Sequence, residues 1–226
     1  MERKPEAGFQ RLPTKVVTMK KNLVRNIGLL SLMGGIVLGL AGCPFGPNKV
    51  VYVPDAALQS AIRSAIDKPF GLLTEEDLLD VKELEAPGLD IRNLEGLEYC
   101  RFLTRANFRS NKIQSITPVS GLTFLTWLDL GDNLVRDIEP LSGLFALEYV
   151  NLFGDFMEIW DWSPLVANAQ AGGLGSGDTI VLPTGTTLDA ENDDAILDYW
   201  LEDYLALVAS GVTIIFADPT ETQVEF

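Results

Sequence analysis

The sequence contains no histidine and only two cysteines, Cys43 and Cys100. Without histidine the chain cannot form a Ser-His-Asp triad, a Cys-His pair or a metal site built on imidazole. Carboxylates are plentiful, but no motif places two of them in one pocket, as acid-base hydrolysis would require. We therefore expect no catalytic residues and no enzyme activity.

Basic residues are scarce, with 17 lysines and arginines against 32 aspartates and glutamates. Residues 1–42 hold 7 of the basic and 2 of the acidic residues, so 10 basic and 30 acidic residues remain from Cys43 onward, a net charge of −20. Such an acidic chain is unsuited to nucleic acid or to adsorption on anionic lipid. It would suit a cationic partner or divalent cations, although solubility is the more common explanation.

A repeat of 22 residues dominates the stretch from Val81 to Asp155. Three sets of positions recur at this interval, with Asp and Trp replacing Asn and Ile in the last repeat: Leu103, Leu125 and Leu147; Asn111, Asn133 and Asp155; Ile116, Ile138 and Trp160. A unit of this length cannot bury its apolar face alone and must stack on its neighbours. The repeat therefore predicts a solenoid.

Within one repeat, the alternation of Leu128 and Leu130 predicts a short strand with one face inward. Asn133 follows and can bind backbone groups where the chain leaves the strand, so we expect an asparagine ladder inside the coils. A weaker first repeat starts at Val81 and has Leu89 at the asparagine position. Cys100 falls on an inward position of that repeat and is expected to be a small buried hydrophobe.

These repeats resemble the leucine-rich repeats of bacterial internalin-like proteins, whose unit is also 22 residues long. The resemblance covers residues 50–165 well. It implies an α/β solenoid of about four coils, a parallel sheet on the concave face, a helical N-terminal cap and a strand-helix-strand C-terminal cap. A repeat fold of this kind serves many partners, so it does not name a ligand.

The N-terminal region has the features of a secretory signal. A basic start from Met19 is followed by an apolar run over residues 27–42 and then by Cys43. The segment Leu40-Ala41-Gly42-Cys43 resembles a bacterial lipobox, which implies cleavage before Cys43 and lipid on its sulfur. We expect translation to begin at Met19 and the protein to be anchored in the bacterial envelope, outside the cytoplasmic membrane or in the outer membrane. An uncleaved membrane helix is the alternative.

The rest of the chain divides into a tether (43–49), an N-terminal helical cap (50–80), the repeats (81–168) and a C-terminal cap (169–226). In the first cap we expect an edge strand at 50–53, a helix over 56–66 capped by Asp55, and a short helix opened by the capping box Thr74-Glu75-Glu76-Asp77. Leu58, Ile62, Ala65 and Ile66 share the expected buried face of the first helix.

An insertion around residues 156–162 breaks the fourth repeat and brings an aromatic cluster of Phe153, Phe156, Trp160 and Trp162. Beyond it the patterns predict a short helix at 166–171, strands at 179–182 and 212–216, and a helix over 189–210 that ends before Gly211. The expected buried side of that helix comprises Leu197, Leu201, Tyr204, Leu205 and Val208.

Two segments of this region invite a ligand. The glycines at 172–177 suggest a phosphate cradle, but they lack a P-loop ending and precede a strand, which favours a turn. The acids Asp189, Glu191, Asp193, Asp194 and Asp198 suggest calcium, but Asp194 and Trp200 replace the Gly and Glu of an EF-hand loop. Acids at a helix N-terminus are favourable on their own. We predict neither a metal nor a cofactor.

The free face of the stacked strands is the candidate binding surface. Side chains between the inward leucines form columns across the sheet: Glu83, Arg105, Trp127 and Tyr149; Glu85, Asn107, Asp129 and Asn151; Arg109 and Phe153. Aromatic residues beside arginine are typical of the centre of a protein interface. The predicted partner-binding residues are Arg105, Arg109, Trp127, Asp129, Tyr149, Asn151 and Phe153.

We therefore expect an envelope lipoprotein that binds another protein, or an envelope polymer, through its concave face. Four strands about 4.8 Å apart give a sheet only about 15 to 20 Å wide, which is small for a protein interface. Two alternatives stay open: a structural envelope lipoprotein without a dedicated ligand, and a carboxylate-based surface hydrolase. Under the structural interpretation, Trp127 and Tyr149 only cover the sheet or pack under the C-terminal cap.

Overall fold

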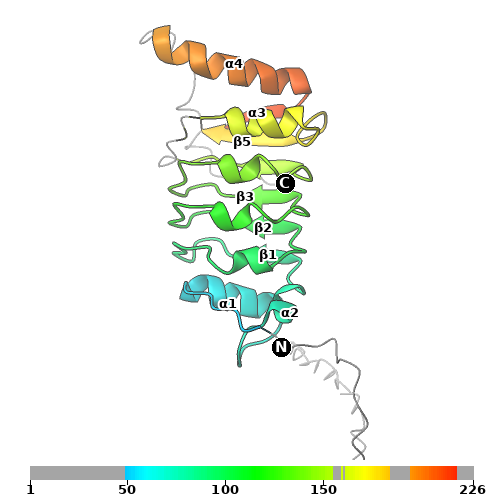
Figure 1. Cartoon of the computed structure of the whole chain (residues 1–226). Coiled ribbons are helices and arrows are strands. Elements are labelled where there is room, and N and C mark those ends of the chain that lie inside the picture. The colour runs from blue at the N-terminus through cyan, green and yellow to red at the C-terminus, as the bar shows by residue number, and fades with distance from the viewer. Residues whose placement is uncertain (1–48, 155–158, 160, 184–193, 218–226) are drawn as a thin grey trace, which may run out of the picture. The chain divides into compact units, whose positions relative to one another are not determined.

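The computed structural model describes residues 49–154, 159, 161–183 and 194–217, and these form a stack of coils with helices at both ends (Figure 1). In chain order the elements are α1 (Ala56–Ala65), α2 (Glu75–Leu78), β1 (Glu83–Glu85), η1 (Leu97–Tyr99), β2 (Arg105–Asn107), η2 (Thr117–Val119), β3 (Trp127–Asp129), η3 (Glu139–Leu141), β4 (Tyr149–Asn151), α3 (Ser163–Gln170), β5 (Thr179–Pro183), α4 (Asp194–Ser210) and β6 (Thr213–Ala217). Each η element is a single 3-10 turn.

The described strands form one parallel sheet in the order β1 to β6. Each coil carries a strand on one side and a short helical segment on the other (Figure 1). The register pairs Arg105 with Trp127 and Trp127 with Tyr149, so residues 22 apart are neighbours. This confirms the predicted α/β solenoid.

The core lies between the strands and the helical segments. Leu103, Leu125 and Leu147 are at most 1% exposed, and they stand one coil apart in the same register. Cys100 is fully buried among these apolar side chains, as predicted. Because each coil covers the apolar face of the one before, burial is shared along the whole stack.

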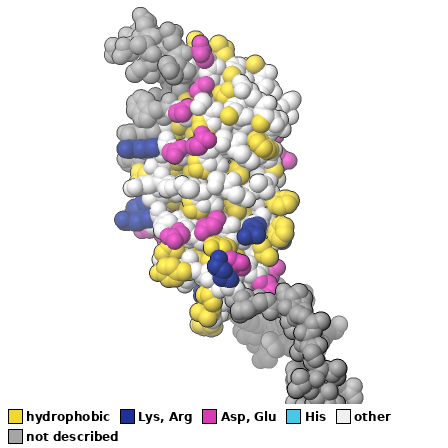
Figure 2. All heavy atoms as spheres, viewed as in Figure 1, with side chains coloured by type: hydrophobic (Ala, Val, Ile, Leu, Met, Phe, Trp, Pro, Cys, Tyr) yellow, Lys and Arg dark blue, Asp and Glu magenta, His cyan; other side chains and the backbone are white. Residues whose placement is uncertain are grey.

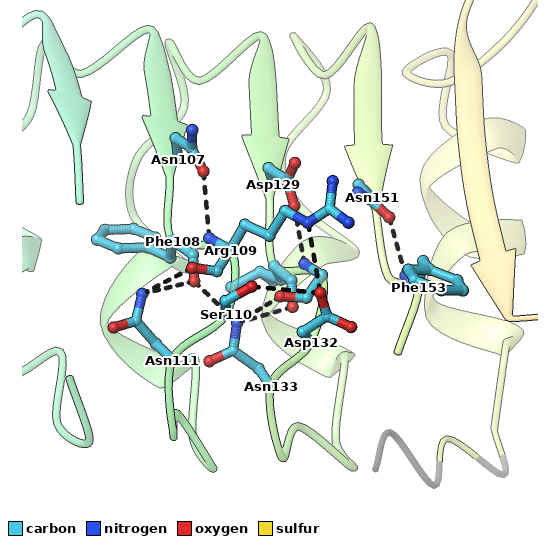
Figure 3. A network of polar contacts seen from close by, with 12 residues as sticks. Asn107, Phe108, Arg109, Ser110, Asn111, Asp129, Asp132, Asn133, Asn151 and Phe153 are labelled. Atoms are coloured by element: carbon cyan, nitrogen blue, oxygen red, sulfur yellow. Dashed lines mark hydrogen bonds and ion pairs between the residues drawn. The ribbon is translucent and has the colours of Figure 1, made fainter. Parts of the chain in front are cut away.

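Two buried asparagines connect successive coils where the chain leaves the strands (Figure 3). Asn111 accepts from the backbone N–H of Ile91 at 2.9 Å and donates to the carbonyls of Ala86 and Phe108, both at 2.8 Å. Asn133 repeats the arrangement one coil later, accepting from the N–H of Ile113 at 3.0 Å. The predicted ladder is confirmed at these two positions, while Asp155 lies outside the described residues.

The residue before each of these positions has a left-handed backbone. Gly88, Ser110 and Asp132 have φ of 66°, 57° and 54°. Glycine adopts this conformation without strain, and short polar residues tolerate it. Leu89 follows Gly88, and its side chain is 43% exposed, so it does not occupy the inward asparagine position that the repeat assigned to it.

The N-terminal cap packs its helix α1 against the first coil. Asp55 is the N-cap, and Thr74 forms the predicted capping box with Asp77. The edge strand predicted at 50–53 is wrong, because only an isolated antiparallel bridge between Val50 and Thr74 forms there. Ala65 is exposed and Ala61 is buried in its place, so the buried face of α1 is rotated from the predicted one.

The C-terminal part adds β5 and β6 to the sheet, which had been expected to contain only the four strands of the repeats. β5 pairs with β4 and β6 pairs with β5, both in parallel. α3 begins at Ser163, earlier than predicted, with Pro164 in its first turn. In α4, Leu207 is buried whereas Leu205 and Val208 are 54% and 46% exposed, so two of the predicted inward residues are wrong.

A third buried asparagine holds the fourth coil to the third. Asn168 on α3 is fully buried and donates to the carbonyls of Leu141 and Leu144 at 2.9 and 3.0 Å. Its oxygen accepts from the N–H of Leu174 at 2.8 Å. A Cβ at position 173 would overlap the Asn168 amide, so Gly173 is the residue that fits there.

Candidate binding surface on the strands

The side chains of Arg105, Trp127 and Tyr149 form a continuous stack across β2, β3 and β4. The Trp127 and Tyr149 rings are nearly parallel, with centroids 5.0 Å apart and an interplanar angle of 7°. The guanidinium carbon of Arg105 lies 3.5 Å from the Trp127 ring centroid. Parallel rings and a guanidinium over indole are both attractive arrangements.

The stack covers both faces of the Trp127 ring. β3 lies between β2 and β4 in the sheet, so Arg105 and Tyr149 approach the ring from opposite sides. All three side chains are partly exposed. Trp127 consequently presents the edge of its indole to solvent, and its flat faces are occupied by its own neighbours.

Glu85 fixes the charged end of this stack. Its carboxylate accepts from Arg105 Nε at 3.3 Å and from Asn107 Nδ2 at 2.8 Å. Both side chains of the ion pair are substantially exposed, so the pair orients Arg105 more than it stabilises the fold. Orientation matters here because a guanidinium must lie flat on the ring to stack.

Tyr149 is protonated at any physiological pH. Burial raises the pKa of its phenol to about 12, and the nearby negative charge of Asp129 adds to the effect. Arg109 and Arg105 act in the opposite direction but are outweighed. The phenol therefore remains a neutral group that can both donate and accept a hydrogen bond.

The second column mainly serves the fold. Asn107, Asp129 and Asn151 each accept from the backbone N–H two residues later, at 3.2, 2.8 and 2.9 Å (Figure 3). Asp129 and Asn151 are only 7% and 6% exposed. The prediction that these two side chains project from the surface is therefore wrong.

Asp129 is a buried carboxyl in this column. Burial raises its pKa above the usual range, although hydrogen bonds from the Gly131 N–H and the Asn151 side chain partly offset the effect. Arg109 lowers and Asp132 raises the pKa further. Asp129 is thus a buried neighbour of the stack that affects the electrostatic environment of Tyr149 and adds little to the exposed surface.

The third column is split between surface and interior. Arg109 is partly exposed, and its Nε donates to Asp132 at 3.3 Å. Phe153 is only 9% exposed, so it too was wrongly placed on the surface. Ser110 also donates to Asp132, so this one carboxylate holds both the Ser110 and the Arg109 side chains in position.

The alternative ligand sites gain no support from the described residues. Gly175 donates its N–H to Asp178 at 2.7 Å, as expected for a self-contained turn at 172–178. In the described part of the chain no three His, Cys, Asp or Glu residues lie together as a metal site would need. The acids at 189–193 lie outside that part. Among the described helices none is long and apolar enough to span a bilayer.

Comparison with known proteins identifies the fold of this chain. No family model matches the sequence. The solved structure of internalin C2 from Listeria monocytogenes is similar over 73% of this chain and 66% of its own, with 22% identity and a TM-score of 0.53. This chain has the internalin-like leucine-rich repeat fold. It spans just under two thirds of that internalin.

Other solved structures are less similar. Internalin F from Listeria monocytogenes matches 72% of this chain and 55% of its own at 21% identity, with a TM-score of 0.45. The structure of the CBM51-2 and INT domains of Clostridium perfringens ZmpB matches 41% of this chain and 20% of its own at 26% identity, with a TM-score of 0.37.

Within the leucine-rich repeat fold, the exposed part of the predicted site reduces to Arg105, Arg109, Trp127 and Tyr149, which we call the strand surface. Sequence reasoning did not select Glu85 and Asp132, the carboxylates that orient its two arginines. A signal for Glu85 was available, because it precedes Asn107 by 22 residues and Arg105 by 20. Asp132 lies beyond the strand, but it follows Ser110 by the same interval of 22 residues.

Proposed function

We propose that this protein is a bacterial envelope lipoprotein, anchored through lipid on Cys43, that binds another protein through its strand surface without catalysing a reaction. The stack of Arg105, Trp127 and Tyr149 carries the proposal. Large aromatic side chains held in place by arginine are the usual anchors of a protein interface. The internalin-like fold is compatible with this role but does not specify a partner.

The geometry favours a protein over an envelope polymer as the partner. A sugar ring packs against the open face of an aromatic ring, and both faces of Trp127 are already covered. The exposed edge of the Trp127 ring and the two arginines instead suit peptide carbonyls and carboxylates. The partner surface should therefore carry acidic or carbonyl groups opposite Arg105 and Arg109.

The rival is a structural lipoprotein with no dedicated ligand. Its supporting observation is the same stack, since Trp127 and Tyr149 could exist only to cover the sheet between them. The two proposals differ in whether a partner lies over the strand surface in cells. An experiment that reports contact at this surface separates them.

A photo-crosslinking residue at Glu83 tests the proposal in intact cells carrying the full chain. Glu83 is exposed and is in register with Arg105, but lies outside the stack. The matched control carries the same residue at Gln114, which is exposed outside the strands. We expect a discrete crosslinked protein from position 83 that is missing from position 114. Equal or absent crosslinking at both positions would contradict the proposal and favour the structural role.

A further inference from the structure

The N-terminal cap exposes an apolar patch that its fold does not require. Val50, Tyr52, Phe70 and Leu72 are 51%, 75%, 85% and 68% exposed. Two residues adjacent to them in the sequence, Val51 and Leu73, are 6% and 2% exposed. This segment is thus apolar on its outward side as well as on its inward side.

Val50, Tyr52 and Leu72 lie on one side of this segment, and Phe70, the most exposed of the four, lies two residues before Leu72 in the sequence. The bridge between Val50 and Thr74 and the hydrogen bond from Val51 N to Leu73 O at 2.9 Å hold the two segments side by side in antiparallel directions, so Tyr52 and Leu72 directly adjoin the paired residues. Alternate residues of extended chain point the same way, so Val50 lies on that side as well. Figure 2 shows hydrophobic side chains gathered at the end of the stack where α1 and α2 lie.

We propose that this cap patch contacts the lipid bilayer that holds the anchor. The described chain begins at Lys49, six residues after Cys43, and those residues reach at most about 20 Å. Four side chains are too few for a stable protein interface, which needs about 20 residues a side. A shallow contact with lipid is sufficient when an anchor already holds the cap at the membrane.

The residues around the patch suit the headgroup region. Lys49 and Lys68 flank the patch in sequence, and Lys49 Nζ pairs with Glu75 at 2.9 Å and Lys68 Nζ with Asp77 at 2.6 Å. Lysines beside exposed aromatic residues can keep their charge in the headgroups while the apolar groups insert. Because Lys49 pairs with Glu75 and Lys68 with Asp77, the lysines offset these two negative charges. This reduces the electrostatic repulsion between the cap and the phosphates of the lipid headgroups.

The proposal rests on the proposed N-terminal anchor but not on any ligand of the strand surface. It is tested with the purified full chain in vesicles of zwitterionic phosphatidylethanolamine and phosphatidylcholine, because the acidic chain is unsuited to anionic lipid. A polarity-sensitive fluorophore is attached to Phe70→Cys or, as the matched control, to Phe124→Cys, another exposed phenylalanine. The chain without these substitutions is the control for background labelling at Cys43. Cys100 is fully buried and is therefore shielded from the thiol reagent.

We expect bromine-labelled acyl chains to quench the label at position 70, and aqueous iodide to quench the label at position 124. Replacing Tyr52 and Leu72 with serine should move the label at 70 towards the iodide-sensitive state. Iodide-sensitive labels at both positions, on protein that floats with the vesicles, would overturn the cap contact and leave the anchor intact. A label at 70 shielded from both quenchers would overturn it in favour of self-association. Protein that does not float would overturn the anchor and this proposal together.

Discussion

Asp55 joins the N-terminal cap to the first coil through a hydrogen bond to a residue 37 positions later. Its Oδ2 accepts from the backbone N–H of Arg92 at 2.8 Å, while its Oδ1 caps α1 by accepting from the N–H groups of Ala57 and Leu58. One carboxylate thus accepts from backbone N–H groups both at the start of α1 and in the neighbouring coil. Few side chains other than aspartate can do both, because both oxygens must be acceptors.

Replacing Asp55 with alanine should lower the free energy of unfolding by about 2 kcal/mol, since both the cap and the contact with the coil are lost. Asp55→Asn is the informative control, because it keeps one acceptor for the cap but places an amide donor against a backbone donor. We expect chemical denaturation to give an intermediate loss for asparagine. No loss for either variant would show that the carboxylate is not a structural link.

The stabilisation by Asp55 should depend on pH. Burial alone would raise the pKa of its carboxyl, but N–H donors led by Arg92 outweigh burial and lower it from the usual 3.8. A lowered pKa gives stability that is present above the unfolded pKa and is lost as pH falls through the folded one. The difference in unfolding free energy between the wild type and Asp55→Ala should therefore shrink below about pH 4. A constant difference down to pH 2 would contradict this linkage.

Asp129 should show the opposite sign. Its pKa is raised by burial, so between the unfolded and folded pKa values the folded state binds more protons and stability falls as pH rises. Asp129→Asn removes this penalty and uses the residue already present at the equivalent positions 107 and 151. We expect the variant to gain stability relative to the wild type as pH increases above 3.8. Parallel stability curves for the two proteins would count against the assignment.

Asn133→Leu should destabilise the solenoid by about 3 kcal/mol or more, because the Leu130 carbonyl and the Ile113 N–H lose their bonds to the side chain and the Phe108 carbonyl keeps only its bond from Asn111. Asn133 is 1% exposed and its amide donates to the carbonyls of Phe108 and Leu130 at 2.9 and 2.8 Å. Gln114→Leu, an amide-to-leucine change at an exposed position, serves as the control and should be nearly neutral. Equal effects in thermal or chemical unfolding would refute a structural ladder.

Cys100 should be inert in the folded protein. Burial raises the pKa of its thiol to about 12, so at pH 8 only about one molecule in ten thousand carries a thiolate, and the sulfur is also inaccessible. Modification by a thiol reagent, followed by mass spectrometry of the Cys100 peptide, should proceed only after denaturant is added. Rapid labelling under native conditions would show that the first coil opens readily.

The sequence predicts the coils well and their ends less well. Leu103, Leu125 and Leu147 align because a constant interval leaves only one way to stack their coils. The burial of Asp129 and Asn151 was not predicted, because strand alternation places both side chains outward. Each is the last residue of a three-residue strand, and its side chain turns back to accept from the backbone N–H two residues later. Alternation describes the interior of a strand and not its last residue.

The C-terminal cap was predicted in its elements but not in its packing. The insertion at 156–162 interrupts the 22-residue interval, so nothing in the spacing indicated that β5 would continue the sheet beside β4. In α4, apolar residues occupy several sides of the helix, and the pattern could not select Leu207 over Leu205. Tertiary contacts decide such a face, and they are not encoded in local periodicity.

The most direct test of the proposed function is the affinity of the partner captured at position 83 for three forms of the full chain. Trp127→Ala with Tyr149→Ala should weaken binding by at least about 30-fold, as expected when two interface anchors are lost. Phe124→Ala with Phe145→Ala removes two exposed aromatic residues elsewhere and should leave the affinity unchanged. Circular dichroism must show an intact fold in both. Equal affinity of all three folded forms would contradict recognition by the strand surface.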